Sequence, residues 1–201
     1  MISFPDKCKV NKFIPKKVFY EKIGVSTAIK DEFVNDIEKI TWLYKLSEDT
    51  LGITKTKQTE EIQVFEVILK GKKLPKNILK IISKAIPYKI LFILRFRSDF
   101  CYAIKVNDVY FTKWNEELSI NLVGLTLDTV YENLVKSIIE EQDNHNDFEY
   151  IIENKSKRDE LIKKIEQLKI KIDNEKQFNK KVELNLEIQK LKKEMEELKN
   201  E

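Results

Sequence analysis

The sequence predicts an α+β fold: a mixed β-sheet with helices packed on it, followed by a coiled-coil-like helical hairpin at the C-terminus. Residues 62–70 and 88–96 are largely apolar on both alternating faces, which is typical of strands that are covered on both sides. Segments with helical spacing of apolar residues lie between and around them. From residue 154 to residue 201 there is no Gly or Pro, and Lys and Glu alternate with spaced Leu, Ile and Val. This order favours a globular domain and a helical tail.

The N-terminal quarter is expected to be mainly helical. An irregular lead-in over residues 7–17 precedes a short helix over 17–23, which should end at Gly24. Ser26 is a suitable N-cap for a second, longer helix. Its apolar residues recur on one side, namely Ile37, Ile40, Leu43 and Tyr44. We expect this helix to fray only between residues 47 and 52.

The middle of the chain supplies the predicted sheet. The strand over residues 62–70 should lie inside the sheet and end at Gly71, and Pro75 then opens a helix over 76–86. The second strand covers 88–96. A hairpin follows, with strands 100–106 and 109–114 around a turn at Asn107–Asp108, and 118–123 could add a strand. Thr126 caps a helix that carries Leu127, Val130, Leu134 and Ile138.

The tail contains two apolar ladders at heptad spacing, which are typical of a helix–helix seam. Twelve residues separate them, a distance that one uninterrupted heptad does not produce. A hairpin turning near residues 174–179 and one long helix with a stutter both fit, and the hairpin is favoured because short polar connections are common between antiparallel helices. The predicted organisation is a globular domain over 1–141, an acidic linker over 142–154 and a hairpin over 155–201. The predicted protein-interaction residues are those of the seam: Leu161, Ile165, Leu168, Ile172, Leu184, Ile188, Leu191, Met195 and Leu198.

Composition excludes several classes of protein. No apolar run is long enough to span a bilayer and the first residues are not a signal peptide, so we expect a cytoplasmic protein without membrane contact. Cys8 and Cys101 are isolated, and His145, the only histidine, lies in the polar linker. We therefore expect no metal site. No phosphate-cradling or hydrolase motif is present, so we expect no cofactor.

The basic residues are unevenly placed. Residues 67–98 contain seven Lys and two Arg and no acid, although the net charge of the whole chain is only +3. Such a block suggests a polyanion partner, DNA or RNA. The predicted nucleic-acid-binding residues are Lys72, Lys73, Lys76, Lys80 and Arg97. The alternative is that these lysines only solvate the surface, since Lys is abundant throughout the chain.

One carboxylate stands out as a weak catalytic candidate. Glu66 lies in the middle of a largely apolar strand, and Lys70 lies on the same strand face four residues later. This pair is similar to the acid and lysine of the PD-(D/E)xK nucleases, in which acids hold Mg²⁺ and the lysine assists the attacking water. The spacing departs from that motif, however, because three residues rather than one separate the acid from the lysine. The alternative is a structural ion pair of Glu66 with a lysine, Arg95 or Arg97.

Four sequence strings resemble those of a known bacterial family, the domain of unknown function family 4391. They are Lys9–Lys16, Ile40–Leu46, Ala85–Tyr88 and Glu175–Asn185. The resemblance implies a cytoplasmic protein of restriction–modification or anti-phage systems that works beside helicases and DNA methyltransferases. We therefore expect a non-enzymatic accessory subunit whose C-terminal helices bind a helicase or nuclease subunit. The alternatives are a divergent metal-dependent nuclease and a homo-oligomeric scaffold.

Overall fold

The computed structural model describes residues 2, 4–118, 122, 124–139 and 148–200. The chain divides into two compact units, Met1–Gln142 and Asp143–Glu201. The first is an α+β unit built on a mixed sheet, and the second is a pair of packed helices. The predicted fold class is therefore confirmed. No helix in the described ranges is long and apolar enough to cross a membrane.

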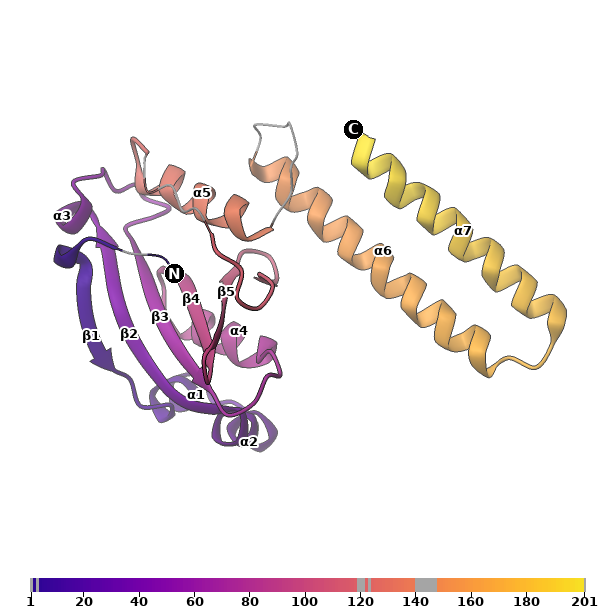
Figure 1. Ribbon diagram of the computed structural model, residues 1–201, viewed down its shortest axis with the longest axis horizontal. Helices are drawn as coiled ribbons and strands as arrows, with labels where there is room; N and C mark the ends of the chain where they lie inside the picture. The colour runs from indigo at the N-terminus through magenta and orange to yellow at the C-terminus, as the bar shows by residue number, and fades with distance from the viewer. Residues whose placement is uncertain (1, 3, 119–121, 123, 140–147, 201) are drawn as a thin grey trace. The chain divides into compact units, whose positions relative to one another are not determined.

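Six strands form one sheet in sequence order (Figure 1). Strands β3 and β4 are parallel, and every other neighbouring pair is antiparallel. The parallel pair is joined by helix α4 (Lys76–Ala85), since parallel strands require a crossover connection. The strands are β1 (Lys9–Phe13), β2 (Ile37–Ser47), β3 (Glu61–Leu69), β4 (Lys89–Phe96), β5 (Asp99–Lys105) and β6 (Val109–Phe111).

The main core lies between the sheet and three helices, α1 (Lys17–Ile23), α2 (Thr27–Asp36) and α4. Phe65 and Phe92 of the sheet and Phe33 of α2 are almost completely buried in it. The β3 residues that alternate with this set, Ile62 and Val64, are also fully buried. Both faces of β3 are thus covered, as the sequence predicted. Helix α5 (Leu127–Ile139) contacts β3, β5 and β6.

The prediction of a helix through Tyr44 was wrong. Helix α2 ends at Asp36, and β2 begins at Ile37. The pairing of β2 with β3 shifts register twice, between Ile37 and Lys39 and between Trp42 and Tyr44. A bulge inserts an extra residue into a strand, so it lengthens the spacing of side chains on one face from two residues to three. Ile37 and Ile40 are therefore both buried in the main core although they are three residues apart in a strand. A spacing of three residues is also typical of one face of a helix, which explains the wrong prediction.

Two smaller differences concern the segment before α1 and the segment after β2. The predicted irregular lead-in contains a 3-10 turn (Asp6–Cys8) and the edge strand β1, whose residues are mostly exposed and therefore show no apolar alternation. A short helix, α3 (Glu48–Leu51), follows β2, and Thr50 and Ser47 form its capping box. The possible strand at 118–123 falls mainly on residues outside the described ones.

The second unit is a helical hairpin, as predicted. Helix α6 (Phe148–Asn174) and helix α7 (Phe178–Asn200) pack together, and residues 175–177 connect them (Figure 1). The carboxylate of Glu175 accepts hydrogen bonds from the backbone N–H groups of Lys176 and Gln177, which hold its pKa below the usual value. Because α6 begins at Phe148, residues 148–154 are helical rather than part of a linker. Residues 142–147 of the predicted linker lie outside the described residues.

Candidate interaction surfaces

The apolar residues of the heptad seam pack against each other between the two helices of the hairpin. Ile165 and Leu168 of α6 and Ile188 of α7 are less than a tenth exposed and form one cluster. Partly buried Ile172, Leu184 and Leu191 pack against it. These side chains, which the sequence analysis assigned to protein interaction, therefore contact each other and hold α6 on α7.

The hairpin also exposes apolar side chains that the seam does not use. Of the nine large hydrophobic residues that are exposed in the described chain, five belong to the hairpin. Three of them, Phe178, Val182 and Leu186, repeat every four residues on α7 and are 78%, 42% and 53% exposed. Residues four apart lie on one face of a helix, so these three form a stripe. The other two are Ile162 and Ile170.

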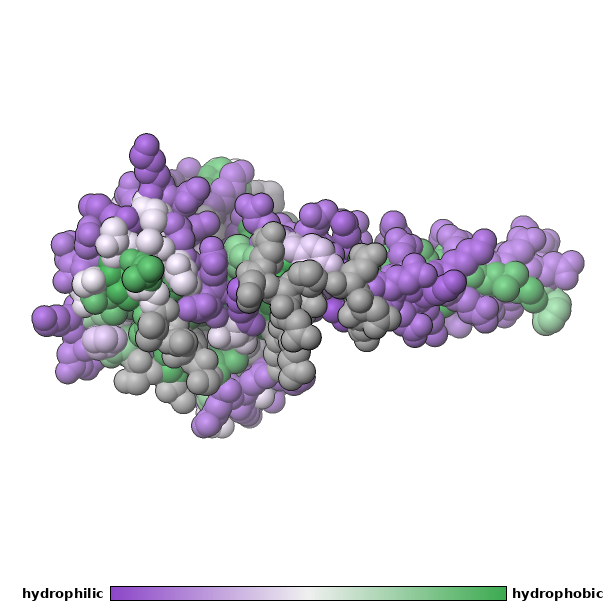
Figure 2. Space-filling model, turned by 90° about the horizontal axis from the view of Figure 1, so that it is seen from above, coloured by the Kyte–Doolittle hydropathy of each residue, from purple (hydrophilic) through white to green (hydrophobic). Residues whose placement is uncertain are grey.

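This α7 stripe was missed because heptad reasoning selects only the residues that face the partner helix. Its signal in the sequence is the spacing of Phe178, Val182 and Leu186 outside the seam positions. Apolar surface is visible among the polar surface of the hairpin in Figure 2. Exposed apolar residues that gather on one element are typical of an interaction site, whereas isolated ones are ordinary.

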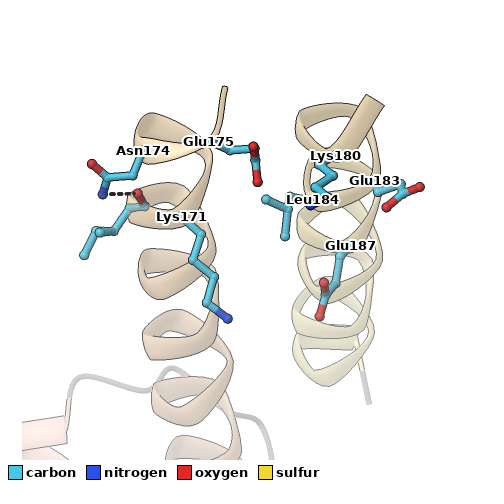
Figure 3. A pocket seen from close by; sticks show the side chains of 8 residues that line it. Lys171, Asn174, Glu175, Lys180, Glu183, Leu184 and Glu187 are labelled. Atoms are coloured by element: carbon cyan, nitrogen blue, oxygen red, sulfur yellow. Dashed lines mark hydrogen bonds between the residues drawn. The ribbon is translucent and has the colours of Figure 1, made fainter. Parts of the chain in front are cut away.

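A groove runs between the two helices near the turn (Figure 3). It is bordered by Lys171 and Asn174 of α6, by Glu175 of the connecting segment, and by Lys180, Glu183 and Glu187 of α7. Ile170 and Leu184 supply apolar surface between these polar and charged side chains. The Asn174 amide donates to the Ile170 carbonyl at 2.9 Å, so it is occupied with the end of α6. The lining of this groove thus combines side chains of both charge signs with apolar surface.

Three lysines of the α+β unit converge on the C-terminal end of α2. Lys16 Nζ donates to the carbonyls of Ile37 and Phe33 at 2.7 and 3.3 Å, and Lys70 Nζ donates to the Val34 carbonyl at 2.8 Å. Lys73 forms an ion pair with Asp36 at 3.3 Å. The last carbonyls of a helix lack partners within it and carry negative partial charge, so cations stabilise this end. Burial and the neighbouring Lys70 lower the pKa of Lys16.

The other predicted DNA-binding lysines also have acidic partners. Lys72 pairs with Asp99 at 2.8 Å, and Lys76 and Lys80 both pair with Asp108, at 2.6 and 2.8 Å. Burial raises the pKa of Asp108, but the hydrogen bonds from the two lysines and from the backbone outweigh it, and its pKa lies far below the usual value. The lysines of the acid-free segment 67–98 thus form ion pairs with Asp36, Asp99 and Asp108, which lie outside that segment.

The structure does not bring the two weak catalytic candidates together. Glu66 Oε1 lies 2.6 Å from Nε of Arg95 on the neighbouring strand, one of the structural pairs considered from the sequence. Lys70 is bound instead to the end of α2. Among the described residues, no three His, Cys, Asp or Glu side chains cluster in a way that could hold a metal ion. Burial raises the pKa of the Cys101 thiol to about 12, so it is not a ready nucleophile.

A buried polar cluster that the sequence analysis missed lies where β3 begins. The Glu61 carboxylate accepts a hydrogen bond from the Gln63 amide and pairs with Lys45 of β2 at 3.2 Å. Glu61 and Gln63 are less than a tenth exposed. A small polar pocket lined by Thr59, Glu61 and Lys89 adjoins this cluster. Because Glu61 already has two partners, its geometry is that of a satisfied structural group.

Taken together, these features define a class of protein: an α+β domain on a mixed sheet that carries a helical-hairpin extension with an apolar outer stripe. Within this class, residues 2–195 match the family model described as domain of unknown function (DUF4391), and the chain belongs to that family. The resemblance drawn from the four sequence strings is confirmed. No curated protein and no solved structure matches the chain.

Proposed function

We propose that this protein is a non-enzymatic accessory subunit of a bacterial DNA-targeting defence or restriction system, and that its hairpin binds a protein partner in the cytoplasm. The observation that carries the proposal is the α7 stripe, Phe178, Val182 and Leu186, on a hairpin whose seam is already filled. The DNA-targeting setting, with a helicase, nuclease or methyltransferase as partner, is what the family resemblance implies.

The physical reason is the cost of apolar surface in water. Burial of apolar area contributes about 25 cal/mol per Å². The seam already supplies the contacts that hold α6 on α7, so the exposed Phe178 and Leu186 side chains add nothing to that packing. A partner that covers the stripe gains this burial without having to open the hairpin. Aromatic side chains such as Phe178 are enriched at protein interfaces.

The test is affinity purification of the full chain from its native host. Phe178→Glu with Leu186→Glu should abolish recovery of the partner and leave the hairpin folded, since both side chains are exposed. The matched control is Lys163→Glu, which makes the same change of two charge units at an exposed position of α6, outside the stripe, and should retain the partner. Leu184→Asp with Leu191→Asp opens the seam and provides a reference without a folded hairpin.

Three outcomes separate the functions considered. Loss of the partner only in the stripe and seam variants supports the accessory role. The homo-oligomeric scaffold is supported by a different result. The wild-type protein recovers no partner, its mass by light scattering is twice that of one chain, and this mass falls in the stripe variant. Equal recovery of the partner by the stripe variant and the control would show that the stripe is not the docking surface.

A further inference from the structure

We propose that one edge of the sheet, formed by Lys72, Lys73, Arg97 and Trp114, binds single-stranded nucleic acid. The cations contact phosphates and the Trp114 ring stacks on a base. This inference deepens the proposed function and rests on its DNA-targeting setting, but it concerns the α+β unit alone. It divides the five basic residues selected from the sequence into a binding set and a structural pair, Lys76 and Lys80.

The topology of the sheet brings the four residues to one edge. Because β3 and β4 are parallel, their C-terminal ends lie side by side. Lys72 and Lys73 come shortly after β3 and Arg97 directly after β4. Trp114 follows β6, and the next residue, Asn115, donates its backbone N–H to the Phe100 carbonyl of β5 at 2.7 Å. The Lys72 ammonium consequently lies 5.8 Å from the centre of the Trp114 ring.

Two cations lie over aromatic rings at this edge. Besides the Lys72–Trp114 contact, the Arg97 guanidinium lies 5.1 Å from the Phe96 ring centre. Proteins that bind single strands combine cations that follow the phosphates with aromatic side chains on which bases stack. Lys72, Lys73 and Arg97 are exposed, and Trp114 packs against the main core with part of its surface exposed. A base pair in a duplex does not offer its face to such a ring, so the arrangement favours a single strand.

Arg97 occupies a backbone position that suits it poorly. It is the first residue of the two-residue loop between β4 and β5, and its φ is +55°. Gly, Asn or Asp is typical where such a loop needs a positive φ, because a longer side chain is disfavoured there. Within the described chain no carboxylate pairs with Arg97. A structural ion pair therefore does not explain an Arg at this position, whereas an exposed guanidinium for an external anion does.

Phosphates can replace the carboxylates that pair with Lys72 and Lys73 at this edge. Asp99 pairs with Lys72 and accepts from the Asn115 amide, and Asp36 pairs with Lys73. Both lysines are more than half exposed in these pairs, and exposed ion pairs contribute little free energy. By contrast, Lys76 and Lys80 are less exposed than Lys72 and Lys73, and they share the single Asp108 carboxylate at 2.6 and 2.8 Å. A phosphate would have to replace a more strongly held partner at those two positions.

The experiment measures binding of the full chain to a labelled oligo-dT of about 16 nucleotides by fluorescence anisotropy at low salt. Arg97→Gly removes the guanidinium and relaxes the backbone. It should weaken binding at least fivefold and leave the melting temperature equal or higher. Arg97→Asn, which also tolerates a positive φ, should behave in the same way. The matched control, Lys80→Gln, removes one charge from the structural pair and should change affinity less than twofold.

Two further measurements test the stacking and the choice of strand. The chain has two tryptophans, so in a Trp42→Phe background the emission reports Trp114 alone, and oligo-dT should quench it. Affinity should fall steeply with salt, as it does for phosphate contacts. Oligo-dT, oligo-U and a duplex of equal length are compared, because DNA and RNA single strands share the chemistry proposed here. The single strand that binds with the higher affinity, oligo-dT or oligo-U, shows whether DNA or RNA is the preferred ligand.

The proposal is overturned if wild-type protein binds no single strand, if it binds the duplex more tightly, or if Arg97→Gly binds as well as wild type. Binding without quenching of Trp114 would remove the stacking contact that distinguishes a single strand. Partner recovery by the hairpin is scored separately in each variant. Loss of nucleic-acid binding with an intact partner complex overturns only this inference, and loss of the partner in the α7 stripe variant concerns only the proposed function.

Discussion

The Glu66–Arg95 pair offers the clearest test of whether the central strand holds a structural group or a catalytic one. Glu66→Ala removes a carboxylate that lies 2.6 Å from the guanidinium and leaves Arg95 less well paired on the sheet. The two side chains are 19% and 32% exposed, which places the pair between a surface salt bridge and a buried one. Surface pairs contribute up to about 1 kcal/mol, and breaking a buried pair costs about 3–5 kcal/mol. We expect a loss of about 2 kcal/mol in the free energy of unfolding.

For a unit of this size, 1 kcal/mol corresponds to about 3 °C, so Glu66→Ala should lower the melting temperature by about 6 °C. Glu66→Gln keeps the shape and one acceptor oxygen and should lose about half as much. Thermal unfolding is followed by tryptophan fluorescence. Trp42 and Trp114 both lie in the α+β unit, so this signal excludes the hairpin, whereas circular dichroism would mix the two units.

Two results would contradict this reasoning. An unchanged melting temperature in Glu66→Ala would show that the pair contributes nothing to the stability of the sheet. The nuclease interpretation makes the opposite prediction, that both variants remain stable and lose a Mg²⁺- or Mn²⁺-dependent cleavage. Detection of that cleavage in the wild-type protein, and its loss in Glu66→Gln at unchanged stability, would place Glu66 in a catalytic role.

Two further predictions concern the lysines. Lys16→Met should lower the stability of the α+β unit by about 1–2 kcal/mol, because the carbonyls at the end of α2 lose a charged donor. The control is Lys12→Met, at an exposed position of β1. Equal stability of the two variants in urea would refute the capping role of Lys16. The depressed pKa of Asp108 contributes stability that is present above the unfolded-state value of about 4 and is lost as pH falls towards the folded-state pKa. Asp108→Asn should therefore be less stable than wild type at neutral pH, with a difference that shrinks below about pH 4; a difference independent of pH would contradict this.

Elements with one clear period were predicted well. The strand β3 and the helix α4 lie within one residue of their expected positions, because a short apolar run that ends at Gly71 favours a strand and a Pro-opened amphipathic segment favours a helix. The spacing of twelve residues between the two ladders fitted a hairpin or a stuttered long helix, and the short polar connection favoured the hairpin. Such local patterns depend on neighbours a few residues away, and a single sequence contains them in full.

Features that depend on distant residues were not predictable in the same way. Nothing near Lys76 in the sequence indicates that Asp108 would meet it, because the contact requires α4 to lie beside the end of the β5–β6 hairpin. The α7 stripe was overlooked because heptad reasoning looks only for the seam. The bulges in β2 depend on its pairing with β3, and they changed the apparent period of the segment from strand to helix.

The sequence by itself determined the fold class, the family, the hairpin with its seam, and the inventory of basic residues. Only the tertiary structure decided which of those residues are engaged. It placed Lys70 and Lys73 on the end of α2, Lys76 and Lys80 on Asp108, and Glu66 on Arg95, and it left Arg97 at an exposed turn with a positive φ. The physical reason is that periodicity reports the local environment of a residue, whereas an ion pair depends on which distant segments the fold brings within a few ångströms.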